Sequence, residues 1–107
     1  MDSETGDMGG QVVFVDVDDT LVRSVGSKRI PIPGVIAYVR RLKAAGAVLY
    51  CWSSGGADYA RAAAEDLDLD ESFSGYLPKP NLILDDQAVA EWSYCRLLRP
   101  LEVPTDL

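Results

Sequence analysis

The chain contains no histidine. This absence excludes Ser-His-Asp and Cys-His catalysis, and zinc sites built on imidazole. Cysteine is scarce as well: Cys51 and Cys95 are the whole set, they form no CxxC pair, and we expect free thiols in a reducing, cytoplasmic compartment. Basic residues are the minority, because 10 Lys and Arg face 17 Asp and Glu and leave a formal net charge of −7. That balance argues against a nucleic-acid partner, which needs a basic surface.

Long apolar runs are lacking too. The longest, such as residues 47–52, are far too short to cross a bilayer, and the acidic start Met1–Glu4 has no apolar segment of a signal peptide. We therefore expect no membrane partner. With 107 residues, 48% hydrophobic and 25% charged, the chain is predicted to form one globular domain over residues 11–99. A flexible tail over residues 1–10 and a second tail over 100–107 flank it.

Strand-like and helix-like segments alternate along that domain. We expect strands over 11–15, 47–52, 73–77 and 82–84, a hairpin over 21–32, helices over 34–45, 57–67 and 88–94, and an edge strand over 96–98. The first strand is apolar on both faces, as in a central parallel strand. Such alternation predicts an α/β fold, namely a minimal three-layer α/β/α Rossmann-like parallel sheet with helices on its faces.

Polar side chains follow three of the predicted strands. Asp16, Ser53 and Asp85 each come directly after an apolar run, with Asp18 and Asp86 close behind. Because the carboxyl ends of parallel strands meet at one edge, these groups are expected to converge there. Clustered carboxylates repel one another unless a cation neutralises them, and all-oxygen ligands favour Mg²⁺.

That set of groups suits phosphoryl transfer. A carboxylate can attack phosphorus and form an aspartyl-phosphate, and a second carboxyl two residues on can serve as general acid and then as general base. The Ser53 hydroxyl and the backbone amides of Ser54 and Gly55, near a helix N-terminus, suit a phosphoryl oxygen. Lys79 would supply positive charge where the transition state spreads negative charge.

Four motifs resemble those of the haloacid dehalogenase (HAD) superfamily of Mg²⁺-dependent phosphohydrolases. Residues 13–22, VFVDVDDTLV, fit its first motif, hhhDxDxT, and residues 49–53, LYCWS, fit the second. Lys79 fits the third motif, and residues 82–86, LILDD, fit the fourth, an acidic pair after a strand. The similarity spans most of residues 12–86.

This resemblance implies a role for each matching residue. Asp16 would be the nucleophile and Asp18 the general acid and base, while Thr20 would order the loop after the first strand. Mg²⁺ would be held by Asp16, Asp85, the main-chain carbonyl of Asp18, and Asp86 directly or through water. Ser53 and Lys79 would bind the phosphoryl group; because Lys79 lies so close to Asp85 in sequence, Lys28 is an alternative for its role.

The spacing of the motifs leaves no room for a cap domain, so the resemblance is to small capless members with an open site. Such a site accepts a small or macromolecular phosphorylated substrate, and a homo-oligomer is one way to close it. The basic residues Arg23, Lys28 and Arg29 could steer an anionic substrate, but a solvated hairpin is the preferred interpretation. Trp52 is interpreted as a core residue.

Two other functions remain open. A receiver-like phosphoacceptor domain also combines an acidic pair, Mg²⁺ and a Lys, but its phosphorylated Asp follows a middle strand, where this chain has Ser53. A non-catalytic module that binds phosphate or Mg²⁺ with the same fold is the second alternative, and the short segment after the fourth motif favours it.

Overall fold

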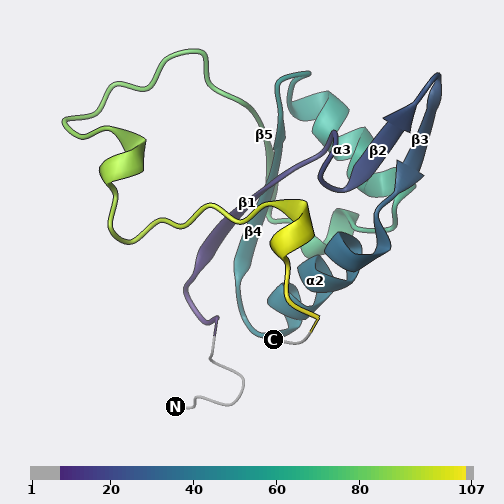
Figure 1. Cartoon of the computed structure of the whole chain (residues 1–107), viewed down its shortest axis with the longest axis horizontal. Helices are drawn as coiled ribbons and strands as arrows, with labels where there is room; N and C mark the ends of the chain where they lie inside the picture. Colours follow the sequence, from purple (N-terminus) through teal and green to yellow (C-terminus); the bar gives the residue numbers. More distant parts are fainter. Residues whose placement is uncertain (1–7, 106–107) are drawn as a thin grey trace.

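The computed structural model describes residues 8–105 (Figure 1). The predicted tail over residues 1–10 therefore lies mostly outside the described residues. The strands are β1 (Val12–Asp16), β2 (Val22–Val25), β3 (Lys28–Pro31), β4 (Val48–Ser53) and β5 (Gly75–Pro78). The helices are α2 (Pro33–Ala44) and α3 (Ala57–Asp66), and three short 3₁₀ turns are η1 (Asp70–Ser72), η2 (Val89–Glu91) and η3 (Pro100–Glu102).

A three-stranded parallel sheet forms the centre of the fold, in the order β1-β4-β5. β1 pairs with β4 from Val12–Val48 to Asp16–Trp52, and β4 pairs with β5 from Tyr50–Gly75 to Ser53–Pro78. Parallel neighbours need a crossover connection, and here α2 and α3 supply the two crossovers. β2 and β3 form a separate antiparallel hairpin that follows β1. The predicted α/β class with a parallel sheet is confirmed.

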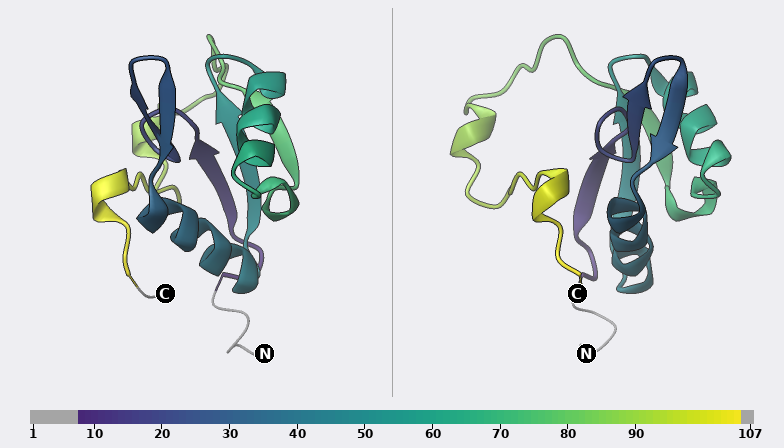
Figure 2. Two further views of the ribbon diagram at one scale, coloured as in Figure 1. Left: turned by 90° about the vertical axis from the view of Figure 1, so that its right-hand side faces the viewer. Right: turned by 45° about the vertical axis from the view of Figure 1, so that its right-hand side comes forward.

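The two helices lie on the same side of the sheet (Figure 2). α2 buries its apolar stripe of Val35, Ile36, Val39 and Leu42, and α3 buries small side chains, Ala60, Ala63 and Ala64. Alanine on the buried face lets a helix approach a sheet closely, because no long side chain separates the two backbones. On β4 the alternate residues Leu49, Cys51 and Ser53 face this core and are buried.

The other face of the sheet carries no helix among residues 8–105, so the predicted helices on both faces occur on one face only. β1 is an edge strand there, not the central strand that its apolar sequence suggested. Phe14 is 45% exposed on this open face, and its ring packs edge-on against Tyr50 and Trp52, with ring centroids 5.6 and 4.9 Å away. Trp52 is half-buried on this face, so its assignment to the core was wrong.

The chain after β5 departs most from the prediction. Residues 82–84 form no strand and the last helix over 88–94 is reduced to the single turn η2; residues 96–98 form no strand either. The segment leaves β5, swings out as a wide loop and returns past the open face (Figure 1). Leu82 and Leu84 are 84% and 97% exposed. Three apolar residues just after Pro78 and Pro80 are too short a run to secure a place in the sheet.

Both cysteines are free thiols, as the sequence predicted. Cys95 is exposed, whereas Cys51 is buried beneath α3, and burial together with the negative charge of Asp16 raises the pKa of the Cys51 thiol to about 12. Cys51 is therefore an inert core residue at neutral pH.

No helix in the described part of the chain is long and apolar enough to span a bilayer.

Candidate functional site

The strands of the parallel sheet bring most of the candidate residues to one edge, here called the carboxyl edge. The register sets Asp16 beside Trp52 and Ser53 beside Pro78, with Lys79 one residue further. The amide of Lys79 donates a hydrogen bond to the carbonyl of Ser53 at 2.9 Å. Asp16, Ser53 and Lys79 therefore come from three adjacent strand ends, as the sequence predicted for Asp16 and Ser53.

The loop after β1 is held in a fixed shape by its own backbone. The carbonyl of Val17 accepts hydrogen bonds from the amides of Thr20, Leu21 and Val22 at 2.9–3.2 Å. Val17 and Leu21 are completely buried and anchor the loop in the core. Asp19 takes a left-handed conformation with φ of 61°, which Asp tolerates better than most residues. Asp16 and Asp18 are thus both presented at the carboxyl edge.

Lys79 and Asp16 form an ion pair. The Lys79 ammonium lies 3.2 Å from Oδ1 of Asp16, and the Thr20 hydroxyl donates to Oδ2 at 3.1 Å. The same ammonium lies 5.8 Å from the ring centroid of Trp52, within the range of a cation–π contact. Both partners of the ion pair remain about one-third exposed, so the pair contributes little to stability but is open to an incoming substrate.

Ser53 starts a tight turn between β4 and α3. Its hydroxyl oxygen accepts from the Gly55 amide at 2.9 Å, and its carbonyl accepts from the Gly56 amide at 3.1 Å. The sequence predicted that the Ser54 and Gly55 amides bind a phosphoryl oxygen, but the Gly55 amide is already used inside the turn. Ser54 is exposed and open to a phosphoryl oxygen, whereas Ser53 is only 1% exposed.

Tyr59, in the first turn of α3, is a member of the site that sequence reasoning missed. Its hydroxyl donates to Oδ1 of Asp18 at 2.7 Å. This hydrogen bond, helped by desolvation and the charge of Asp18, raises the pKa of Tyr59 above its ordinary value, while Arg29 opposes the rise. Tyr59 therefore stays protonated and donating at neutral pH. The sequence did offer one signal: Tyr59 falls in the first turn of the helix predicted directly after Ser53. The first turn of such a helix lies close to the carboxyl ends of the strands, where the other candidate residues were expected.

Asp85 and Asp86 do not join this edge. They lie in the exposed loop after β5, where the carboxylate of Asp85 accepts from the Gln87 amide at 2.9 Å. Within residues 8–105 no group of three or more carboxylate or thiol side chains is close enough to hold a metal together. The predicted cluster of four carboxylates, Asp16, Asp18, Asp85 and Asp86, is therefore not assembled. The strand predicted over residues 82–84 does not form, so Asp85 and Asp86 are not carried to the carboxyl edge.

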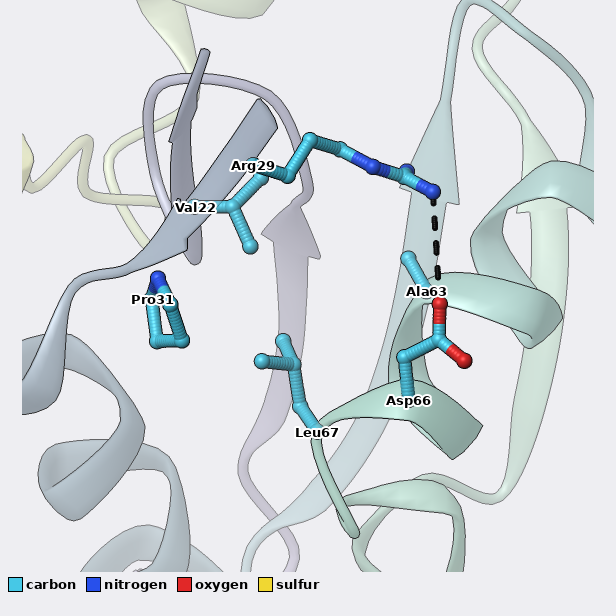
Figure 3. Close-up of a pocket in the computed structure, with 6 residues that line it drawn as sticks. All are labelled: Val22, Arg29, Pro31, Ala63, Asp66 and Leu67. Atoms are coloured by element: carbon cyan, nitrogen blue, oxygen red, sulfur yellow. Dashed lines mark ion pairs between the residues drawn. The ribbon is translucent and has the colours of Figure 1, made fainter. Parts of the chain in front are cut away.

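The basic hairpin is tied to α3. Arg29 of β3 reaches across to Asp66 at 4.0 Å (Figure 3). It also lies 5.1 Å from the ring centroid of Tyr59. Arg23, Lys28 and Arg29 are all exposed, but Arg29 already has partners within the protein in Asp66 and Tyr59. The cavity beneath this ion pair measures about 150 Å³ and contains no candidate catalytic residue. A larger one, about 440 Å³, borders the loop after β1 at Asp19 and Arg23.

A family model, described as "Protein of unknown function (DUF705)", matches residues 4–79. The chain belongs to the DUF705 family. The DUF705 match ends at Lys79, so it takes in Asp16, Asp18, Ser53, Tyr59 and Lys79 and leaves out the loop with Asp85 and Asp86. No curated protein and no solved structure matches the chain.

Proposed function

We propose that this protein is a Mg²⁺-dependent phosphohydrolase that works through an aspartyl-phosphate on Asp16. The observation that carries the proposal is the ion pair of Asp16 with Lys79 at 3.2 Å, at the carboxyl edge of a parallel sheet. A carboxylate beside a lysine, both partly open to solvent, combines a nucleophile with the positive charge that a transferring phosphoryl group needs. Ligands of open α/β sheets bind at this edge.

The reaction follows from the positions of the two aspartates. An Asp16 carboxylate oxygen attacks phosphorus, the bond from phosphorus to the leaving oxygen breaks, and that oxygen takes a proton from the Asp18 carboxylic acid. Asp18, now a carboxylate, then removes a proton from water. The resulting hydroxide attacks phosphorus, releases inorganic phosphate and restores the Asp16 carboxylate. Lys79 and the Ser53 hydroxyl hold the phosphoryl oxygens through both steps.

The donors at the carboxyl edge fit Mg²⁺. Asp16 and Asp18 offer hard oxygen ligands only, and Mg²⁺ is commonly held by one or two carboxylates together with water and substrate phosphate. Such a site does not require the carboxylates of Asp85 and Asp86. The ion would neutralise charge on the phosphoryl group; Asp16 and the main-chain carbonyl of Asp18 are the residues that would hold it.

We also propose that the fold is that of a capless HAD phosphohydrolase. The chain order of β1, hairpin, α2, β4, α3 and β5 contains no inserted cap between the motifs in the described residues, which supports the resemblance to capless HAD phosphohydrolases with a Rossmann-like sheet. An open site of this kind admits a small or a macromolecular phosphorylated substrate, and a homo-oligomer could cover it. We place this activity in the cytoplasm, in line with the two free thiols.

One observation favours a second candidate function. Because Asp85 and Asp86 lie in a loop away from Asp16, the chain has fewer metal ligands than the HAD resemblance implies. A non-catalytic module that binds phosphate or Mg²⁺ would need only the residues that lie at the carboxyl edge, namely Asp16, Ser53 and Lys79. The receiver-like alternative is less favoured, because the middle strand β4 ends in Ser53 and the candidate phosphoacceptor Asp16 follows an edge strand.

Metal removal tests the proposal directly. We expect the purified protein to hydrolyse p-nitrophenyl phosphate with Mg²⁺ present, and to lose at least about 100-fold in rate with EDTA, because charge on the phosphoryl group is then not neutralised. Adding back excess Mg²⁺ should restore the rate. Equal rates with Mg²⁺ and with EDTA would contradict metal dependence, and binding of phosphate without any turnover would favour the non-catalytic module.

The choice between the two candidate lysines can be tested with a matched pair of variants. We expect Lys79→Met to lower kcat by about 10²- to 10³-fold, the usual cost of removing one group that stabilises transition-state charge. Methionine keeps an apolar stem over Trp52 while it removes the charge. Lys28→Met removes the same charge from the exposed β3 and should leave kcat unchanged. The reverse outcome would assign the role to Lys28.

A further inference from the structure

Tyr59 connects two segments that are far apart in the sequence. It lies in the first turn of α3, and its hydroxyl donates to Oδ1 of Asp18, 41 residues away, at 2.7 Å. This length is ordinary for a well-formed hydrogen bond from a hydroxyl to an oxygen. Asp18 is half-buried, so the bond is partly shielded from competing water.

The ring of Tyr59 has two close neighbours. One is Gly55, where an added Cβ atom would come within 3.1 Å of the Tyr59 ring, tighter than an ordinary contact. The other is Arg29, whose guanidinium lies 5.1 Å from the ring centroid and also reaches Asp66 of the same helix (Figure 3). Glycine at position 55 thus leaves room for the ring, and Arg29 ties the ring to the hairpin.

We propose that Tyr59 is a positioning residue for Asp18, supported by Arg29. Tyr59 occupies Oδ1 and leaves Oδ2 as the oxygen that gives a proton to the leaving group and later takes one from water. Oδ1 can accept this hydrogen bond whether Oδ2 is protonated or not, so the arrangement serves both half-reactions. Without the hydroxyl, the Asp18 carboxyl is free to rotate away from the leaving group. This inference rests on the proposed phosphohydrolase function.

The expected consequence is selective for the leaving group. The leaving group of a dinitrophenyl phosphate is stable as an anion and departs without proton donation from Asp18. The leaving group of an alkyl phosphate is an alkoxide, which must be protonated as it leaves. In Tyr59→Phe we therefore expect kcat/KM for an alkyl phosphate such as glycerol phosphate to fall by about 10²-fold, the lower end of what general acid catalysis contributes. For dinitrophenyl phosphate the fall should stay below about threefold. We use kcat/KM because it reports phosphoryl transfer to Asp16 and not the later hydrolysis.

A matched control is available in Tyr76. Its hydroxyl also donates one hydrogen bond, to the Asp70 carbonyl at 3.1 Å, but outside the site, so Tyr76→Phe should leave the ratio of the two kcat/KM values unchanged. Arg29→Gln provides a second variant in case Tyr59→Phe folds poorly. It removes the cation beside the ring and should move the ratio in the same direction by a few-fold.

The possible results distinguish the positioning role of Tyr59 from the proposed phosphohydrolase function. If Tyr59→Phe lowers kcat/KM equally for both substrates, or for neither, the positioning role is overturned while the phosphohydrolase function stands. If the unaltered protein hydrolyses neither ester with Mg²⁺, the proposed function fails and the role of Tyr59 fails with it. A loss confined to the alkyl ester, in Tyr59→Phe and not in Tyr76→Phe, supports the inference.

Discussion

Replacing Asp16 with asparagine is expected to abolish phosphate-ester hydrolysis, with a loss of at least about 10³-fold in kcat. An amide of the same shape is a very poor nucleophile towards phosphorus. The variant also loses the negative charge that Lys79 faces at 3.2 Å, so the ammonium is left without its partner. The measurement is hydrolysis of p-nitrophenyl phosphate with Mg²⁺, together with chemical trapping of the acid-stable phosphoprotein, which should be absent from Asp16→Asn.

Asp19→Asn is the matched control for this loss. Asp19 lies in the same loop and carries the same charge, but it is exposed and has left-handed backbone dihedrals that asparagine adopts readily. We expect Asp19→Asn to keep the rate of the unaltered protein. Circular dichroism melting curves of both variants separate a folding defect from a chemical one. If Asp16→Asn retained more than about a tenth of the rate, Asp16 would not be the nucleophile.

The sequence predicted the fold well up to Lys79. β1, the β2–β3 hairpin, α2, β4, α3 and β5 all lie within a few residues of their expected bounds. The signals are strongest for three of them: apolar runs of four or more residues form β1 and β4, and apolar residues at helical spacing form α2, whereas the signal for β5 is weaker. The meeting of Asp16 and Ser53 at one edge followed from the parallel direction of these strands, without any knowledge of side-chain contacts.

The sequence was a poorer guide to which face of the sheet is covered. An apolar strand is consistent with burial on both faces, but burial depends on a second layer that must come from elsewhere in the chain. Here residues 82–84 and 88–94 do not supply it, so Phe14 and Trp52 stay partly exposed and Asp85 stays away from Asp16. Tyr59 was missed for a related reason, because its contact with Asp18 is a tertiary one between residues far apart in the sequence.

Truncation of a core leucine is expected to produce the largest effect on stability. Leu49 is 0% exposed in the middle strand β4, so Leu49→Ala should lower the free energy of unfolding by about 2–5 kcal/mol through lost burial and the cavity left behind. Leu84 offers the same chemical change at a site that is 97% exposed, and Leu84→Ala should change the free energy of unfolding by less than about 0.5 kcal/mol.

Urea unfolding of the two leucine variants, followed by circular dichroism, therefore tests the fold as well as the energetics. The midpoint should fall clearly for Leu49→Ala and stay in place for Leu84→Ala, with similar slopes for both. A large loss at Leu84 would mean that residues 82–84 are buried in a fourth strand, as the sequence alone suggested. That result would return Asp85 and Asp86 to the carboxyl edge beside Asp16, because a strand added in parallel to β1 ends where β1 ends.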